Sequence, residues 1–136
     1  MGGFPLMTYP EEHTFRVEGK PIPQGSKSVS RSGHMYEANK AHKAWRQKVE
    51  QTARAEGIQF GDRPVQVHLV FYFTPPQRPK FNVHAVKPDT DKLARSVNDS
   101  LTRAGMIHDD ARIVFLTARK RYAETPGVDI TIRSIE

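Results

Sequence analysis

Residues 65–73 read Val-Gln-Val-His-Leu-Val-Phe-Tyr-Phe, and this stretch decides how the rest of the chain is interpreted. Every second side chain is apolar from Val65 to Phe73, which predicts a β-strand with one face in the protein core. The intervening positions include Val70 and Tyr72, so the opposite face is partly apolar as well. Either a helix over that second face or an interface with a second copy of the chain would account for it.

A long helix is predicted on the N-terminal side of this strand, over residues 39–56. Apolar side chains recur there at helical spacing, with Asn39 placed to cap the start and Gly57 to cap the end. Trp45 lies on the apolar stripe of this helix. That position favours a place in the core over a role as a base-stacking platform.

Three shorter features are expected before this helix. Residues 1–12 contain scattered Gly and Pro and are interpreted as a flexible tail, which leaves residues 13–136 as one domain. Residues 13–18 alternate in hydrophobicity and predict a first strand. Residues 28–36 are interpreted as a small hairpin around Ser32-Gly33.

The C-terminal half is predicted to hold a second helix and two more strands. Residues 74–88 contain four prolines and form a long loop. The helix opens at Asp89-Thr90-Asp91 and ends before Gly105, and strands follow over 113–123 and 128–135. This order predicts a single α+β domain with two main helices and a mixed or antiparallel sheet.

Composition narrows the possible functions of the chain. It has 136 residues, enough for one compact domain, and no cysteine, which excludes a disulfide scaffold, a cysteine nucleophile and a thiolate metal site. No apolar run is long enough to cross a membrane, and the N-terminus lacks a signal-peptide pattern, so a cytoplasmic protein is expected. The formal net charge of +6 favours a polyanionic partner, with nucleic acid ahead of a membrane surface.

Four aspartates flank the second helix in a region otherwise rich in Lys and Arg: Asp89 and Asp91 at its start, Asp109 and Asp110 after its end. Carboxylates in positive surroundings suit a Mg²⁺ ion that faces a phosphate backbone. Helix caps and turns are the structural alternative for the same residues. Because the helix spans roughly 20 Å, residues 108–110 must fold back if Asp110 is to reach Asp89.

Three runs of sequence carry a family resemblance: KPDTDKLAR at 87–95, NDSL at 98–101 and GMIHDDARIV at 105–114. Together with the basic-aromatic run at 119–122, they resemble the signature of the RusA family, whose members are Holliday junction resolvases often encoded by phages and prophages. In that signature D-x-D opens a helix, D-x-L lies in its last turns, and an Asp pair precedes a strand. The similarity extends over nearly the whole chain.

The resemblance implies a RusA-like fold and a homodimeric endodeoxyribonuclease that nicks four-way DNA junctions symmetrically in recombination and repair. It implies that Asp89, Asp91 and Asp110 hold one or two Mg²⁺ ions, with Mn²⁺ as a substitute. The same three carboxylates and Arg95 are then the catalytic residues. The expected partners are four-way junction DNA and a second copy of the chain, with no membrane, and the expected location is the nucleoid.

Two positions of the chain depart from the family pattern. Arg95 stands where the family has a lysine. It keeps the positive charge needed to bind phosphate, but a role in proton handling does not carry over to a guanidinium. Lys92 stands where an asparagine follows D-x-D, and an ammonium group has no acceptor with which to coordinate a metal.

Other titratable residues lie near the acidic clusters. Asp99 follows Arg95 by four positions, which favours an intrahelical ion pair over a direct metal role. Asp109 either supports the metal site or caps a turn. His84 and His108 are candidate bases, although an ordinary solvent-exposed loop histidine is the favoured interpretation of each.

Six basic residues are candidate phosphate contacts because few acids lie near them: Lys27, Arg31, Arg78, Lys80, Arg119 and Arg121. Lys92, which follows Asp91, is a seventh candidate DNA contact. The alternative function is a non-catalytic basic DNA-binding module, in which the aspartates are only caps and turns. A phosphoryl transferase that acts on nucleotides is disfavoured, since the sequence has no G-x-x-x-x-G-K-[ST] loop.

Overall fold

The structure is a computed structural model that describes residues 9–24 and 32–136, with side chains of the first helix described from residue 40 onward. The elements follow one another as β1 (Glu12–Glu18), α1 (Ser32–Ala55), β2 (Val65–Phe73), α2 (Thr90–Arg103), a short 3₁₀ helix (Asp110–Arg112), β3 (Ile113–Tyr122) and β4 (Gly127–Ser134). The order of helices and strands predicted from the sequence is confirmed. The 3₁₀ helix was not predicted.

The four strands form one mixed sheet in the order β1-β4-β2-β3. Strand β4 pairs antiparallel with β1 and with β2, whereas β3 pairs parallel with β2 and forms an outer edge of the sheet. A parallel pair needs a crossover connection, and α2 supplies it by returning the chain from the end of β2 to the start of β3. The α+β class with a mixed sheet is therefore confirmed.

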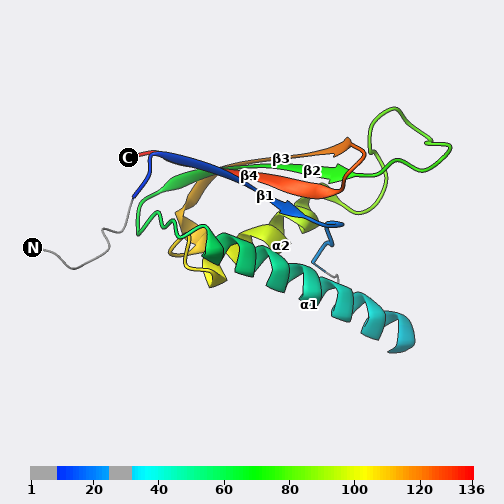
Figure 1. The fold of residues 1–136 in the computed structure, drawn as a ribbon, viewed down its shortest axis with the longest axis horizontal. Helices are drawn as coiled ribbons and strands as arrows, with labels where there is room; N and C mark the ends of the chain where they lie inside the picture. Colours follow the sequence, from blue (N-terminus) through cyan, green and yellow to red (C-terminus); the bar gives the residue numbers. More distant parts are fainter. Residues whose placement is uncertain (1–8, 25–31) are drawn as a thin grey trace, which may run out of the picture.

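Both helices lie on the same face of the sheet, as Figure 1 shows. The alternate side chains of β2 that the sequence predicts as core, from Val65 to Phe73, are all buried on that face. Trp45 of α1 is also buried, as predicted, and belongs to the same core. The core thus fixes α2 against the sheet, and with it the acidic residues at both ends of that helix.

The start of α1 differs from the prediction. The helix begins at Ser32, seven residues before the expected cap Asn39, so the proposed strand over 34–36 and the turn at Ser32-Gly33 are wrong. Serine and glycine are turn residues by local propensity, but once a helix is nucleated each added residue gains a hydrogen bond and the helix extends through them. Gly57 ends the helix as predicted, with φ of 67°.

Some expectations fall on residues outside the described part of the chain. These are residues 1–8 of the expected tail and residues 28–31 of the expected hairpin. Tyr9 and Pro10 follow the first of these two segments. The Arg63 guanidinium donates a hydrogen bond of 3.1 Å to the carbonyl of Pro10 and lies over the ring of Tyr9. Both residues therefore contact the folded domain.

Candidate metal and DNA site

Asp89 is the residue at which α2 begins. Its backbone is extended, with φ of −70° and ψ of 138°, and its carbonyl accepts the first helical hydrogen bond from the Leu93 N–H. Its side chain makes no capping hydrogen bond, so the alternative in which this carboxylate serves as the helix cap is not supported. The carboxylate is exposed, and its nearest described cation is the Lys92 ammonium, 3.6 Å away.

Asp91 and Arg95 lie one helical turn apart on α2, and both are exposed. Residues four positions apart project from the same side of a helix, so Arg95 and Asp91 can face the same phosphate. The first N–H groups of α2 have no helical partner, and the positive end of the helix dipole favours an anion there. This end of α2 therefore brings together carboxylates that could hold a cation and positively charged groups that could bind phosphate.

Lys120 connects this end of α2 to the sheet, a role that the sequence analysis missed. Its ammonium donates hydrogen bonds to the carbonyls of Val86 and Pro88, at 2.6 and 2.8 Å. Burial lowers the pKa of Lys120, and the charge of Asp89 opposes that shift. The sequence does contain a signal that sets Lys120 apart. Because side chains alternate along β3, Lys120 points to the face of the sheet that the helices cover, whereas Arg119 and Arg121 point to the open face.

A shallow groove of about 790 Å³ lies in front of Asp89. It is lined by the end of the loop, the first residues of α2 and the Lys120 side chain: Val83, His84, Ala85, Val86, Lys87, Asp89, Thr90 and Lys120. The groove is open enough to receive a backbone segment of nucleic acid. Its single carboxylate stands among lysines, as the basic surroundings of Asp89 in the sequence led us to expect.

Asp110 lies at the other end of α2, and the Thr102 hydroxyl in the last turn donates a hydrogen bond to its carboxylate. With 14 residues, α2 separates Asp110 from Asp89 by about 20 Å. Among the described side chains, those of residues 9–24 and 40–136, no three from His, Asp or Glu come close enough to hold one metal ion. The condition for Asp110 to reach Asp89 within one chain is therefore not met: residues 108–110 do not fold back, since Asp110 bonds the last turn of α2 and the 3₁₀ helix leads directly into β3.

The carboxyl groups of Asp99 and Asp110 are neighbours. Partial burial of Asp99 and, next, its hydrogen bond and charge interaction with Asp110 raise the pKa of Asp99, while Arg103 and Arg46 oppose the shift. The expected ion pair between Asp99 and Arg95 is not among the ion pairs of the described residues. The Asp99 side chain instead lies near Asp110, at the C-terminal end of α2. This placement depends on how the 3₁₀ helix packs against α2, which the spacing along the sequence does not show.

Two remaining candidates near the acidic residues have structural partners. Asp109 accepts a hydrogen bond of 3.4 Å from the Ala111 N–H at the start of the 3₁₀ helix, which supports the capping alternative. His108 is exposed and lies 3.8 Å from Asp62. Neither contact places these side chains near Asp89.

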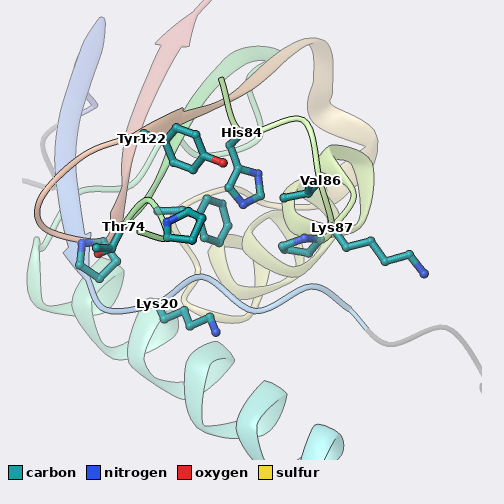
Figure 2. Close-up of a pocket in the computed structure, with 10 residues that line it drawn as sticks. Lys20, Thr74, His84, Val86, Lys87 and Tyr122 are labelled. Carbon is teal, nitrogen blue, oxygen red and sulfur yellow. The ribbon is translucent and has the colours of Figure 1, made fainter. Parts of the chain in front are cut away.

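His84 does not fit its prediction, because it is 8% exposed rather than a solvated loop histidine. Its ring stacks on Phe73, with ring centres 4.2 Å apart, and meets the ring of Tyr122 edge-on at 5.4 Å. Figure 2 shows His84 beside Tyr122, above the pocket that both residues line. Sequence reasoning missed this burial because it depends on how the proline-rich loop folds back over the end of the sheet.

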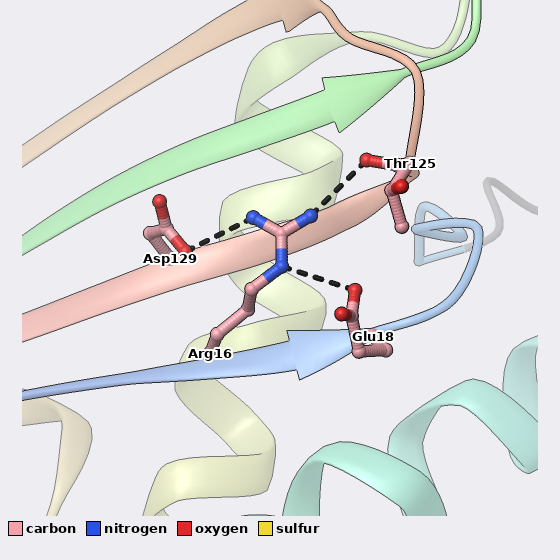
Figure 3. A network of polar contacts seen from close by, with 4 residues as sticks. All are labelled: Arg16, Glu18, Thr125 and Asp129. Atoms are coloured by element: carbon pink, nitrogen blue, oxygen red, sulfur yellow. Dashed lines mark hydrogen bonds and ion pairs between the residues drawn. The ribbon is translucent and has the colours of Figure 1, made fainter.

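The face of the sheet opposite the helices carries no covering element among the described residues. Figure 3 shows its most extensive polar network: the Arg16 guanidinium donates hydrogen bonds to Glu18 and Asp129 and to the carbonyl of Thr125, at 3.0 to 3.1 Å. Arg16 also lies over the ring of Tyr72. Arg16 thus covers Tyr72 on the partly apolar second face of β2, and no helix of the described residues covers that face, whereas the alternative of an interface with a second copy stays a prediction.

The basic candidates occupy two places in the fold. Arg119 and Arg121 are exposed on the open face of β3, and Arg78 and Lys80 are exposed in the loop after β2. In Figure 1 this loop projects beyond the end of the sheet. Lys27 and Arg31, the remaining candidates apart from Lys92, lie outside the described residues.

Comparison with known proteins identifies the family. None of the helices in the described part of the chain is long and apolar enough to span a membrane. No curated protein matches the sequence. A family model described as Endodeoxyribonuclease RusA matches residues 18–133, which include both helices, β2, β3 and all of β4 except Ser134, but only the last residue of β1. The chain therefore belongs to the RusA endodeoxyribonuclease family.

Proposed function

We propose that this chain resolves four-way DNA junctions by paired, symmetric cleavage that depends on Mg²⁺. RusA proteins are metal-dependent Holliday junction endodeoxyribonucleases of recombination and repair, which supplies the substrate and the reaction class. The observation that carries the proposal for this chain is the carboxylate of Asp89, which is exposed, makes no capping hydrogen bond to α2 and lies in a groove lined by Lys87 and Lys120. The nucleoid in the cytoplasm, where such junctions arise, is the proposed place of action.

The residues at the start of α2 fit a divalent cation. Mg²⁺ commonly takes one or two carboxylates, with water and substrate phosphate completing its shell, and Asp89 and Asp91 offer the carboxylates. A bound divalent cation would activate water and stabilise the leaving oxygen in phosphodiester hydrolysis. Arg95 and Lys92 would bind non-bridging phosphate oxygens, and Lys120 would hold the backbone that carries Asp89.

Asp110 belongs to this site only if a second copy of the chain supplies it. The outer strand β3 has an exposed apolar segment that suits such an interface, with Val114 60%, Phe115 51% and Leu116 43% exposed. An unpaired strand edge with apolar side chains on both faces is a surface that proteins normally cover. We infer that β3 pairs with β3 of a partner subunit around a two-fold axis.

This pairing would bring the two halves of the site together. In an antiparallel pair around a two-fold axis, the start of one β3 lies opposite the end of the other. Asp110 precedes the start of β3, whereas Asp89 is held beside its end through Lys120. Each site would therefore combine Asp89 and Asp91 of one chain with Asp110 of the partner subunit, and two sites would serve the paired cuts.

The direct test is cleavage of a synthetic four-way junction and of a matched linear duplex, in Mg²⁺, in Mn²⁺ and in EDTA. We expect cleavage of the junction alone, at two symmetric positions, and only when a divalent cation is present. Binding of the junction without cleavage under all three conditions would reject the nuclease. It would favour the basic DNA-binding module instead.

A further inference from the structure

A pocket of about 320 Å³ lies beside the groove, and Figure 2 shows the residues that line it. Ten residues from four segments of the chain line it: Lys20, Phe73, Thr74, Pro76, His84, Val86, Lys87, Pro88, Tyr122 and Pro126. The volume lies at the lower end of the range of small-ligand sites. The pocket is contiguous with the groove, because His84, Val86 and Lys87 line both.

The walls of the pocket suit a flat aromatic ligand. The His84 ring stacks directly on Phe73, at 22° and with ring centres 4.2 Å apart, and Tyr122 meets His84 at 67°, so the three rings form one aromatic cluster that lines the pocket. In Figure 2 the Tyr122 hydroxyl points into the space beside His84. Stacking on aromatic side chains, with a few polar groups at the ring edge, is how proteins hold a nucleobase that has left the double helix.

One buried polar atom in the pocket lacks a partner. His84 is more than nine-tenths buried, and its Nδ1 forms no hydrogen bond with the described residues. A buried ring nitrogen without a partner costs free energy, so such an atom normally has a ligand or a water to meet it. Burial and, next, the charge of Lys120 lower the pKa of His84, which keeps the imidazole neutral near pH 7 and able both to donate and to accept.

The charge around the pocket matches a nucleotide. Lys20 and Lys87 are its charged lining residues, and no carboxylate is among the ten. Asp89 lies just beyond the lining residue Pro88, in the adjoining groove, where the phosphate to be cut would lie. A base in the pocket and the scissile phosphate in the groove would therefore belong to neighbouring positions of one DNA strand.

From these observations we propose that the pocket receives one unpaired base of the junction next to the scissile phosphate, and that His84 reads its hydrogen-bonding edge. The proposal rests on the proposed function and adds to it the source of base preference at the cut. Base pairs at a branch point lack continuous stacking, which lowers the cost of moving one base out of the helix. His84 acts on specificity and has no part in the hydrolysis itself.

The first experiment locates the base without requiring cleavage. Junctions carrying 5-iodouracil at single positions around the cut are bound in EDTA and irradiated, and the crosslinked peptides are identified by mass spectrometry. We expect one position, adjacent to the cut, to crosslink to Phe73, His84 or Tyr122. Crosslinks confined to the exposed basic residues of β3, or spread evenly over all positions, would overturn the proposal.

The second experiment separates recognition of the base by His84 from the contribution of His84 to the stability of the fold. His84→Phe keeps the stacked ring and removes both ring nitrogens, so we expect it to fold with an equal or higher Tm. Wild-type enzyme should favour one base at the crosslinked position by about tenfold or more in cleavage rate, and His84→Phe should reduce this preference to about threefold or less with junction affinity unchanged. His13→Phe, a histidine of β1 that bonds Glu56 outside the pocket, is the matched control and should keep the preference.

The outcomes distinguish this proposal from the function on which it rests. A preference that is absent in the wild type, or unchanged in His84→Phe, would reject the reading role even if junctions are cleaved normally. If a side chain of the partner subunit fills the pocket in the dimer, Tyr122 should form no crosslink to the junction. That result would also reject the reading role of His84. Absence of any junction cleavage by wild type would reject the nuclease instead, while the crosslinks in EDTA still report on the pocket.

Discussion

The ammonium of Lys120 donates a 2.8 Å hydrogen bond to the carbonyl of Pro88, the residue before Asp89. Lys120 is on the edge strand and Pro88 ends the long loop, so this contact holds the start of α2 against β3. A second bond, to the carbonyl of Val86, anchors the loop at one more point. The placement of the Asp89 carboxylate thus depends on a side chain 31 positions later in the sequence.

Replacement of Lys120 tests this positioning role. Lys120→Met keeps the apolar stem but loses both hydrogen bonds, so we expect the cleavage rate of bound junction to fall by on the order of tenfold or more, with little change in the affinity for the junction. The measurement is single-turnover cleavage at saturating enzyme. Lys43→Met, on the exposed surface of α1, is the control and should cleave normally. Equal loss of affinity and rate in Lys120→Met would instead make Lys120 a phosphate contact.

The three predicted metal ligands should each be essential for cleavage. Asp89→Asn, Asp91→Asn and Asp110→Asn each remove one negative charge from the proposed cation site and should reduce junction cleavage by on the order of 10² or more. Junction affinity should be retained or rise slightly, since carboxylate–phosphate repulsion falls. Glu124→Gln, in the turn between β3 and β4 (Gly127–Ser134), should behave as wild type. Near-normal cleavage by any one aspartate variant removes that residue from the site.

The basic residues should separate into two classes. Arg95→Ala is expected to lower the cleavage rate more than the affinity, because Arg95 lies one turn from Asp91 beside the proposed cation. Lys80→Ala and Arg121→Ala are expected to weaken binding and to reduce the slope of log K against log salt by about one for each phosphate that the variant no longer neutralises. Unimpaired turnover in Arg95→Ala would show that this guanidinium has no catalytic role.

The interface between α1 and α2 should make stability depend on pH. Burial and, next, the charges of Arg46 and Arg103 lower the pKa of His42 below its ordinary value of 6.5, and its Nε2 lies 3.0 Å from the Ser96 hydroxyl. As the pH falls, His42 therefore takes up a proton in the unfolded chain before it does so in the folded protein. The free energy of unfolding should decrease below about pH 6.5.

Urea unfolding at about pH 7.5 and about pH 5.5 measures this loss. His42→Gln, which can still bond Ser96 but does not titrate, should lose less free energy of unfolding between the two conditions than wild type. The same loss in both proteins would assign the pH dependence to other groups. His84 is the first of these, because its pKa is lowered in the same direction.

Local patterns predicted most of the fold. The alternation of residues 65–73 and the helical spacing around Trp45 depend on which side chains face the core, and both are confirmed by burial. The start of α1 was not predictable from Ser32-Gly33, because helix extension outweighs the local preference of these residues for a turn. The parallel pairing of β2 with β3 follows from the path of α2, which single-strand patterns do not contain.

The site was predicted as a set of residues rather than as an arrangement. The spacing of Asp89 and Asp91 around the start of α2 is a local feature, and their positions agree with it. The position of Asp110 beside Asp99 and the burial of His84 depend on contacts between distant segments. Lys120 was the one positioning residue with a readable signal, since strand alternation sets it apart from Arg119 and Arg121.

The central claim is that two copies of the chain share each metal site of a junction nuclease. It is tested most directly with a purified heterodimer of Asp89→Asn and Asp110→Asn chains, carrying different tags, on a supercoiled cruciform plasmid in Mg²⁺. One of its two sites would be intact and the other doubly altered, so we predict nicked circles, whereas wild type linearises the plasmid. The heterodimer of Asp89→Asn with Asp91→Asn should be inactive. An equally inactive Asp89→Asn and Asp110→Asn heterodimer would contradict the shared site.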